Sequence, residues 1–395
     1  MRISSSQMYS VTSMLNQQAK LAETQLQLST GSRILSPSDD PVGAVRSLEL
    51  NRAQDQTEQY LRNADLLDSR LRLEESVVDS SIDVVQRIHE LTIQANNDSQ
   101  SNETRQSIAT ELRQQLDNLL SLANTNDSDG RFIFSGYQEE TTPFTKTENG
   151  YVYNGDDGQR ELQIGPSRRM ADGDSGSEVF MNIKNGNGQF LASASSANTG
   201  SGVIDAGNVT DIQAYDRDSV TIRFSTGSQY DILDESGAVI DSGAYLSGGD
   251  ITVGGMTVSI DGDPASGDEF SLAPSQRQDL FSMVENLATS LETPRTNTGE
   301  RSALHNEINT ALSGFDQALD HLIETQSDIG ARMSSLERQI DINEGASLQI
   351  SENLSVVNDL DYAEAISRFS QQQTALQAAQ QAFAKTQGLS LFNYL

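Results

Sequence analysis

The 395-residue sequence contains no cysteine, so it can form neither disulfides nor thiolate metal sites. It also contains no tryptophan, and hydrophobic residues make up only 35% of the chain and aromatic residues 6%. This composition is thin for a globular enzyme with a thick core. It suits an elongated protein built from helices that each bury one stripe, over a length that fits two or three domains of about 150 residues.

Basic residues are scarce as well. The chain has 26 Lys and Arg against 57 Asp and Glu, which gives a formal net charge of −31. Such a surface repels nucleic acid and anionic lipid, because both need clustered Lys and Arg for binding. We therefore expect no nucleic-acid partner, and we interpret the acidity as a means of keeping a helix-rich chain soluble before it assembles.

Long apolar runs are also missing. No stretch of the sequence approaches the roughly 18 residues that a membrane-spanning helix needs, which predicts no membrane insertion. The first ten residues contain one Arg and no apolar core, so we expect no cleavable secretory signal there. Export by a route that reads no such signal stays open.

What the chain does contain is a large apolar residue at every seventh position near each end. A seven-residue period predicts a helix that buries a narrow seam against another helix. Because short isolated helices are marginal in water, we expect these seams to pair with each other or with neighbouring molecules. We interpret the two ladders as an assembly interface: Met14, Leu21, Leu28 and Leu35 at the start, and Tyr362, Phe369, Leu376 and Phe383 at the end.

Further helices are predicted between the ladders. The first ladder lies on a predicted helix over 7–28, and Asp40 followed by Pro41 is typical of a helix start, for a helix running to about Asn96. Another begins at Asn102, with Ile108, Leu112, Leu116 and Leu119 on one face. The clearest coiled-coil pattern runs over 304–357, and we expect its stripe to be internal core: Ile308, Leu312, Phe315, Leu319, Leu322, Ile329, Met333, Leu336, Ile340, Ile350, Leu354 and Val357.

The heptad phase slips by two residues across Asn358–Asp361, before the Tyr362 ladder begins. The first ladder is likewise followed by a stretch dense in turn-forming residues before Pro41. Both interruptions separate a terminal helix from an inner bundle. They indicate that the terminal helices form a layer of their own.

The middle of the chain changes to the alternating pattern of β-strands. We predict a short strand over Arg131–Gly136 and a hairpin that joins 151–153 to 161–165 through the turn residues 154–158. From 166 to 274, alternating apolar residues such as Ile222 and Phe224, separated by Gly-rich turns, predict a small all-β domain. Within it, 185–202 is predicted to be a flexible loop.

These patterns together predict a mainly α, elongated helical rod with an inserted small all-β domain. Coiled-coil-like N- and C-terminal segments would pack together. We divide the chain into terminal assembly helices (1–40 and 360–395, an axial layer), a helical rod domain with a β-hairpin (41–165 and 275–359) and an inserted β domain (166–274). Residues 1–40 and 360–395 are expected to lack stable order in an isolated monomer, because their apolar seams would be unpaired.

We find no residue pattern that indicates catalysis or cofactor binding. His89, His305 and His321 lie far apart on predicted helices without co-ligands, so we interpret them as structural. The Asp172-Gly-Asp174 and Asp261-Gly-Asp263 turns lack the Gly that a calcium loop needs at its sixth position, and we expect them to be solvated acidic turns. The sequence thus predicts no catalytic, cofactor or metal site.

Two separated motifs resemble the signatures of the bacterial flagellin superfamily. The first runs from Leu28-Ser-Thr-Gly-Ser-Arg-Ile34 through Ser38-Asp-Asp-Pro41. The second is Leu360-Asp-Tyr-Ala-Glu364 with the Gln-rich helix that follows it to Leu395. The likeness extends over the first 165 and last 120 residues, roughly, in the family's order.

Four segments are more similar to the hook–filament junction proteins of this superfamily than to filament flagellins. Ser36-Pro-Ser-Asp-Asp-Pro41 differs from the usual flagellin form around the Asp pair. Arg131–Gly136 and the ending Leu389–Leu395 resemble junction-protein motifs, and Gly262–Phe270 resembles a segment of hook-associated proteins.

The resemblance implies a structural part of the extracellular bacterial flagellum. Such a protein would leave the cell through the flagellar type III export channel, bound beforehand to an export chaperone. It would form a ring of identical subunits between another hook-associated junction protein and flagellin. Two alternatives stay open: a filament-forming flagellin, and an enzyme or adhesin activity in the β domain.

Overall fold

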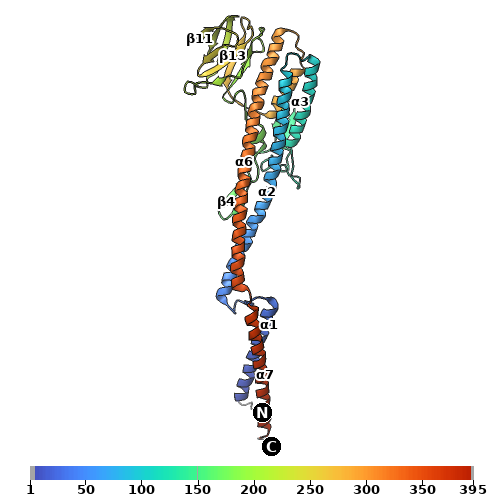
Figure 1. Ribbon diagram of the computed structural model, residues 1–395, viewed down its shortest axis with the longest axis vertical. Coiled ribbons are helices and arrows are strands. Elements are labelled where there is room, and N and C mark those ends of the chain that lie inside the picture. Colours follow the sequence, from blue (N-terminus) through green and yellow to red (C-terminus); the bar gives the residue numbers. More distant parts are fainter. Residues whose placement is uncertain (1–4, 149, 393–395) are drawn as a thin grey trace. The chain divides into compact units, whose positions relative to one another are not determined.

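The fold is mainly α, with long N- and C-terminal helices packed together and a small all-β domain inserted between them, as predicted (Figure 1). The computed structural model describes the backbone of residues 5–148 and 150–392, and the side chains of 8–148 and 150–385. The last residues of the predicted 389–395 motif therefore lie outside the described part. Two compact units are present: a terminal unit, Met1–Asn63 with Arg338–Leu395, and a central unit, Ala64–Glu337.

The long helices begin and end near the predicted residues, and their caps explain why. Gly43 donates its N–H to Asp40 Oδ1 (2.9 Å), while Pro41 occupies the first helical position, where its missing N–H costs nothing. Asp361 Oδ1 accepts the N–H groups of Ala363 and Glu364, so the predicted slip in phase is a true break between two helices. The helices are α1 (Ser5–Thr30), α2 (Pro41–Ala95), α3 (Asn102–Ala123), α5 (Leu280–Glu292), α6 (Thr298–Asn358) and α7 (Tyr362–Phe392).

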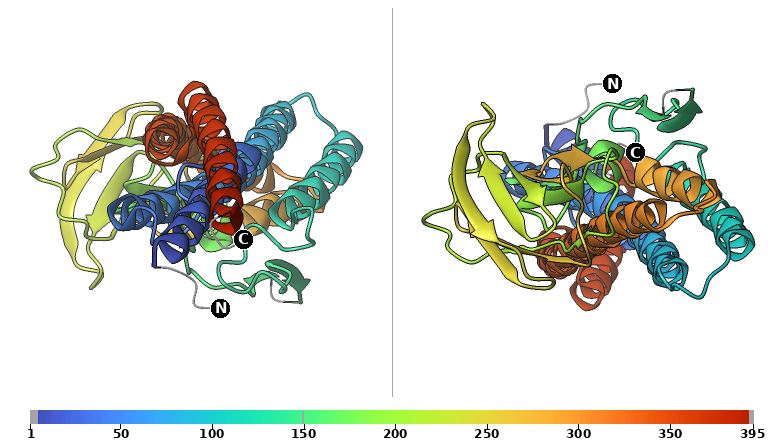
Figure 2. Two further views of the ribbon diagram at one scale, coloured as in Figure 1. Left: turned by 90° about the horizontal axis from the view of Figure 1, so that it is seen from below. Right: turned by 90° about the horizontal axis from the view of Figure 1, so that it is seen from above.

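The helical core of the central unit is formed by α2, α3, α5 and α6. Helices α3 and α5 lie side by side (Figure 2). The predicted α6 stripe supplies the fully buried residues Ile308, Phe315, Leu322, Ile329 and Leu336 at seven-residue intervals. Within the central unit this stripe is internal core, which confirms the interpretation of the heptad pattern there.

A cluster of aromatic rings fastens the short elements of the central unit to α5. The Phe144 ring lies 4.9 Å from that of Phe281 and 5.7 Å from that of Phe180, and Phe180 meets Phe134 edge to face at 5.3 Å. Each such pair adds about 0.5–1.5 kcal/mol to the burial of its rings. The cluster joins β1 (Phe144–Thr147), β2 (Gly150–Tyr153) and α4 (Gly176–Phe180) to the bundle.

The predicted strand over Arg131–Gly136 is wrong. Only an isolated bridge between Asn126 and Phe132 forms there. The chain turns instead, because Asp127 Oδ1 accepts the N–H of Arg131 (3.0 Å) and Gly136 adopts a φ of 67°, in the left-handed region that favours glycine.

The predicted pairing of 151–153 with 161–165 is also wrong. Strand β2 pairs with β1, and β3 (Glu161–Gly165) pairs with β4 (Arg168–Ala171), which gives two separate hairpins. The carboxylate of Asp156 explains the difference, because it accepts the N–H groups of both Tyr137 and Gly158 at 2.9 Å. These bonds fold the 154–158 segment against the turn at 135–137 rather than into a hairpin loop.

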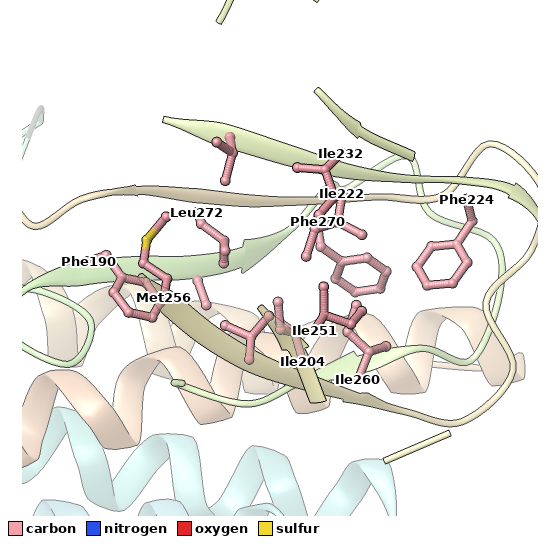
Figure 3. Close-up of a cluster of buried hydrophobic side chains, with 13 residues drawn as sticks. Phe190, Ile204, Ile222, Phe224, Ile232, Ile251, Met256, Ile260, Phe270 and Leu272 are labelled. Carbon is pink, nitrogen blue, oxygen red and sulfur yellow. The ribbon is translucent and has the colours of Figure 1, made fainter. Parts of the chain in front are cut away.

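The inserted β domain consists of two packed sheets. Its five-stranded sheet has the order β11-β10-β9-β14-β6, and its second sheet has the order β12-β13-β7, with β8 also paired to β13. The alternating residues Ile222, Phe224 and Ile260 point into the core between the sheets, as predicted (Figure 3), and Val258 is buried in the same cluster. The strands are β6 (Phe190–Ala194), β7 (Val203–Ile204), β8 (Asn208–Val209), β9 (Val220–Thr226), β10 (Gln229–Leu233), β11 (Val239–Ala244), β12 (Asp250–Val253), β13 (Met256–Asp261) and β14 (Glu269–Pro274).

The predicted long loop over 185–202 is wrong, because it contains strand β6 with the fully buried Phe190. The Asn187 side chain shapes the turn before this strand. Its Oδ1 accepts the N–H groups of Gln189 and Phe190, and its Nδ2 donates to the carbonyls of Ala206 and Gly207. Just before this turn, β5 (Ile183–Lys184) pairs with β15 (Arg277–Gln278), which closes the base of the domain.

Asn306 on α6 anchors the β domain to the helices of the central unit. Its Oδ1 accepts the N–H of Ile204 (2.8 Å), and its Nδ2 donates to the carbonyl of Gly202 (3.1 Å). The buried side-chain amide therefore both accepts from and donates to the backbone at β7, as the backbone of a paired strand does. Such a two-point polar contact fixes the seat of the domain on α6.

Candidate assembly surface

The first ladder lies along α1 and the turn that follows it. Met14, Leu21 and Leu28 lie on α1, and Leu35 lies just before α2. All four side chains are half-buried. Helix α1 contacts α7 (Figure 1), so the predicted pairing of the two terminal helices is present within one chain.

The second ladder lies along α7 and is equally incomplete in its burial. Phe369, Leu376 and Phe383 are half-buried, and Tyr362 is 52% exposed. The hydroxyl of Tyr362 lies over Gly31, where an added Cβ would come within 2.8 Å of it. Gly31 follows the last residue of α1 with a φ of 72°, in the left-handed region that favours glycine. Glycine at this position therefore allows both the helix to end and the Tyr362 hydroxyl to lie close to the backbone.

The fully buried side chains of this helix pair are small or polar. Among the side chains described on α1 and α7, the fully buried ones are Thr24, Gln27 and Ala365. Gln27 was not predicted from the sequence, since a lone Gln on a Gln-rich helix gives no sign of burial. Its Nε2 donates to the carbonyl of Arg33 (2.9 Å) and so ties α1 to the chain beyond it.

Backbone hydrogen bonds join the two linkers that bound these helices. Leu360 donates its N–H to the carbonyl of Gly31 (3.0 Å), and Arg33 donates its N–H to the carbonyl of Asn358 (2.7 Å). The Ser32 hydroxyl donates to Asn358 Oδ1 (3.0 Å). The linkers therefore form a short antiparallel bridge that sets the two ladders in register.

Further apolar side chains of the terminal helices face outward. On α1, Tyr9 is 79% and Leu15 59% exposed, and Ile366 on α7 is 57% exposed. These three residues were not predicted from the sequence. Ile366 could have been found, because it follows Tyr362 by four positions and so shares its face of the helix.

The two units differ sharply in charge. The terminal unit carries nine Lys and Arg against twelve Asp and Glu, a net charge of −3, whereas the central unit carries 17 against 45, a net charge of −28. Like charges repel across the surfaces of approaching molecules. Copies of the terminal unit can therefore approach one another with far less repulsion than copies of the central unit.

Each histidine has a hydrogen-bond partner, in agreement with a structural role. His89 Nε2 lies 3.1 Å from Asp316 Oδ1, His305 lies between Asn96 and Asp98, and His321 Nε2 lies 2.7 Å from the carbonyl of Glu178. Throughout the described ranges, no three His, Asp or Glu side chains converge in a geometry that could hold a metal ion. None of the helices described over these ranges has the length and apolar character that a membrane span requires.

The prediction that Asp172 and Asp174 are solvated turn residues is wrong. Asp172 is 5% exposed and pairs with Arg160 (2.5 Å) and Arg70 (3.4 Å), and Asp174 pairs with Arg332. The guanidinium groups of Arg70 and Arg332 come from distant parts of the chain, so no local sequence pattern predicts these two pairs. Both carboxylates are part of buried ion pairs that join this loop to α2 and α6.

A second buried carboxyl, that of Glu74 on α2, adjoins this loop. Its Oε1 accepts the N–H of Asp174 (2.8 Å), while its Oε2 is buried without a hydrogen-bond partner among the described residues. Burial, together with the nearby Asp174 carboxylate, raises the pKa of Glu74 to about 8. The folded structure therefore favours the protonated form of Glu74 more than the unfolded chain does.

Comparison with known proteins finds relatives along the whole chain. Residues 3–139 match the bacterial flagellin N-terminal helical region, and residues 312–395 match the bacterial flagellin C-terminal helical region. The chain is 27% identical to flagellar hook-associated protein 3 of Escherichia coli, over 99% of both chains.

Solved structures agree with this relationship. FlgL of Xanthomonas campestris is 30% identical, with a TM-score of 0.74 over 78% of this chain and 99% of that one. The flagellar junction protein FlgL of Legionella pneumophila is 35% identical, with a TM-score of 0.68 over 74% of this chain and 99% of that one. The chain therefore belongs to the flagellin superfamily and, within it, to the hook-associated protein 3 (FlgL) family of structural flagellar junction proteins.

Proposed function

We propose that this protein forms a ring of identical subunits that joins another hook-associated junction protein to the flagellin filament. The observation that carries the proposal is the full-length match to flagellar hook-associated protein 3, which extends over both helical ends and the inserted domain. The paired terminal helices with incompletely buried apolar seams support it, because they are built to gain neighbours. The role is mechanical rather than catalytic.

We further propose that the two ladders are the assembly interface. Seven of the eight side chains are half-buried and Tyr362 is more than half exposed, so neighbouring subunits can cover the remainder. Covering apolar surface releases about 25 cal/mol per Å². The ladders would become fully buried only within the assembled flagellum.

The terminal helices would form the axial layer of that assembly. We propose the layering 1–40 with 360–395 for the axial layer, 41–165 with 275–359 for the rod, and 166–274 for the outer β domain. The helix breaks at Gly31 and at Asn358–Asp361 support a boundary between the first two layers, because one helix ends at each of them before the next begins.

We also propose that the protein reaches the extracellular flagellum through the flagellar type III export channel, partly unfolded and held by a dedicated chaperone beforehand. Family membership supports this route. A chain without cysteine needs no disulfide chemistry to refold outside the cell.

Electron microscopy of flagella from a strain that lacks this protein would test the proposal. We expect hooks without filaments, and flagellin monomer lost to the medium. Filaments of normal length on those hooks would contradict the junction role. Purified protein that polymerises by itself into long filaments would indicate a filament-forming flagellin instead.

A further inference from the structure

Two exposed apolar helix faces of the terminal unit lie outside the ladders. The first, which we call the α2 face, contains Val42, Val45 and Leu48 on the opening turns of α2. The second, the α6 face, contains Ile342, Leu348 and Val356 on the closing turns of α6. All six side chains are between 52% and 82% exposed.

The α2 face is apolar at its centre and basic overall. At 100° per residue, Val42, Val45 and Leu48 share one side of the helix with Arg46 and Arg52. One acidic residue, Glu49, lies on the same side. A groove of about 240 Å³ adjoins this face, and its lining mixes apolar residues such as Leu35 and Leu48 with polar ones such as Ser47 and Asn51.

The α6 face also has apolar residues flanked by charged ones, but its charged residues are acidic. Asp341, Glu344 and Glu352 lie on the side of the helix that carries Leu348 and Val356. The sequence contains no Lys or Arg between Arg338 and Arg368, so no basic side chain of α6 itself offsets these carboxylates. Gly345 lies among them with open space around it, which leaves the helix surface accessible there.

The charged groups of both faces lack partners within the chain. Among the described residues, Arg46 and Arg52 form no ion pair or side-chain hydrogen bond, and neither do the three carboxylates of the α6 face. Elsewhere in the terminal unit such pairs do occur, as between Arg368 and Glu364 (2.7 Å). The two faces therefore have complementary charge and unused binding capacity.

We propose that the α2 face of one copy of this chain binds the α6 face of the next copy. Arg46 and Arg52 would meet the carboxylates of the α6 face around a shared apolar centre. Because the two faces differ, the contact is head-to-tail, and such contacts continue from subunit to subunit around a ring or helix. The inference rests on the proposed assembly of identical subunits, but it concerns residues outside the terminal ladders.

The charge distribution explains why the occupant is a second copy. A partner for the α6 face must present cations beside apolar residues, and the α2 face of the same molecule does so. The terminal unit is close to neutral, so two copies can approach there, whereas the strongly acidic central unit repels its own copies. Opposite charges at a rim also fix register and exclude wrong partners.

Charge reversal tests the contact in flagella of a strain that carries only the variant gene. We expect Arg52→Glu and Glu352→Arg each to lower the amount of protein in isolated flagella about three- to ten-fold, because each places like charges together. The double variant restores the opposite pairing and should recover most of the loss. Arg301→Glu, at an exposed and unpaired arginine of the central unit, is the matched control for added negative charge.

Three outcomes of this experiment would overturn the proposal. They are single variants that assemble like the unchanged protein, a double variant no better than the worse single one, and a control variant with the same loss. Circular dichroism of each purified variant shows whether it keeps its helices. If the unchanged protein is itself missing from the hook–filament junction, the proposed function fails rather than this inference alone.

Crosslinking offers a second test that does not depend on charge. The chain contains no cysteine, so Val45→Cys and Leu348→Cys can be combined in one variant. A short bis-maleimide should then crosslink successive subunits in isolated flagella into dimers and larger multimers. Either single variant should give no dimer. A dimer from Val45→Cys alone, or a crosslink to a different flagellar protein, would contradict the head-to-tail contact. In the control variant, Ile323→Cys replaces Leu348→Cys beside Val45→Cys, and equal crosslinking in that control would also contradict the contact.

Discussion

The terminal and central units solve the problem of burying apolar residues in different ways. In the central unit, side chains such as Leu71, Phe281 and Phe315 are fully buried, and nearly all of the chain's net charge covers the surface. In the terminal unit, the ladder residues are only partly buried, and the net charge is only −3. The central unit thus closes its core and carries the charge, whereas the terminal unit leaves apolar surface that the proposed neighbours would cover.

The difference has an energetic scale. Full burial of a Leu or Phe side chain stabilises by about 1.5–3 kcal/mol relative to full exposure. A partly exposed ladder side chain can therefore gain up to about 1 kcal/mol when a neighbour covers the rest of it. Over the eight ladder residues this gain is of order several kcal/mol per subunit, which would favour the proposed assembly.

The largest expected effect is the loss of assembly when the second ladder is charged. Phe369→Asp with Leu376→Asp places two carboxylates in the seam, and burying unpaired charge is very costly. We expect incorporation into flagella to be abolished while the central unit stays folded. Immunoblots of isolated flagella, with circular dichroism of the purified protein, measure the two effects separately.

Gln373→Asp with Gln380→Asp is the matched control, because both positions are exposed on α7 and seven residues apart. This variant should assemble normally. Equal loss from the control would mean that negative charge anywhere on α7 blocks export or assembly, and the distinction between the seam and its outer face would disappear.

The next largest effect is on the stability of the central unit. Phe281→Ala removes a fully buried ring from the aromatic cluster and should lower the free energy of unfolding by about 3–5 kcal/mol. Leu376→Ala in the half-buried ladder should lower it by less than about 1 kcal/mol in the monomer. Urea unfolding of both full-length variants measures the two changes in the free energy of unfolding. Similar decreases for the two variants would contradict the predicted difference between the units.

A smaller effect concerns pH in the central unit. The pKa of Glu74 is raised in the folded protein from an ordinary value of 4.5 to about 8, so the folded state binds this proton more tightly than the unfolded state does. The stabilisation is fully present below pH 4.5 and is lost as the pH rises towards 8. Gln cannot ionise, so Glu74→Gln should reduce the loss of folding stability between pH 4.5 and 8 by a few kcal/mol at most.

Thermal or urea unfolding at intervals from pH 4.5 to 9 measures the effect, as the difference between the unchanged protein and the variant. Other titrating groups cancel in that difference. A difference that does not depend on pH would show that Glu74 is ionised in the folded protein.

The long helices could be predicted because their periodicity is a property of the local sequence. The α6 stripe, the cap at Asp40 and the break across Asn358–Asp361 depend on residues within a few turns of one another, and the structure agrees with them. The strands of the β domain were predictable for the same reason, since Ile222 and Phe224 alternate on β9.

The short hairpins could not be predicted, because side chains distant in sequence decide them. Asp156 redirects its segment by accepting N–H groups from Tyr137 and Gly158, and Asp172 is buried because Arg70 arrives from α2. The assembly surface was predictable only in part. The seven-residue repeat of the ladders predicts an apolar seam. The exposed residues Tyr9 and Leu15 and the α2 face follow no such repeat, so they could not be predicted.

The measurement that most directly tests the contrast between the units is hydrogen exchange in a confirmed monomer and in isolated flagella. In the monomer, amides of α1 (Ser5–Thr30) and α7 (Tyr362–Phe392) should exchange much faster than those of α3, because their seams lack neighbours. In flagella the same amides should become protected. Strong protection of α1 and α7 already in the monomer would contradict the account, because the terminal helices would then be a closed core rather than an assembly surface.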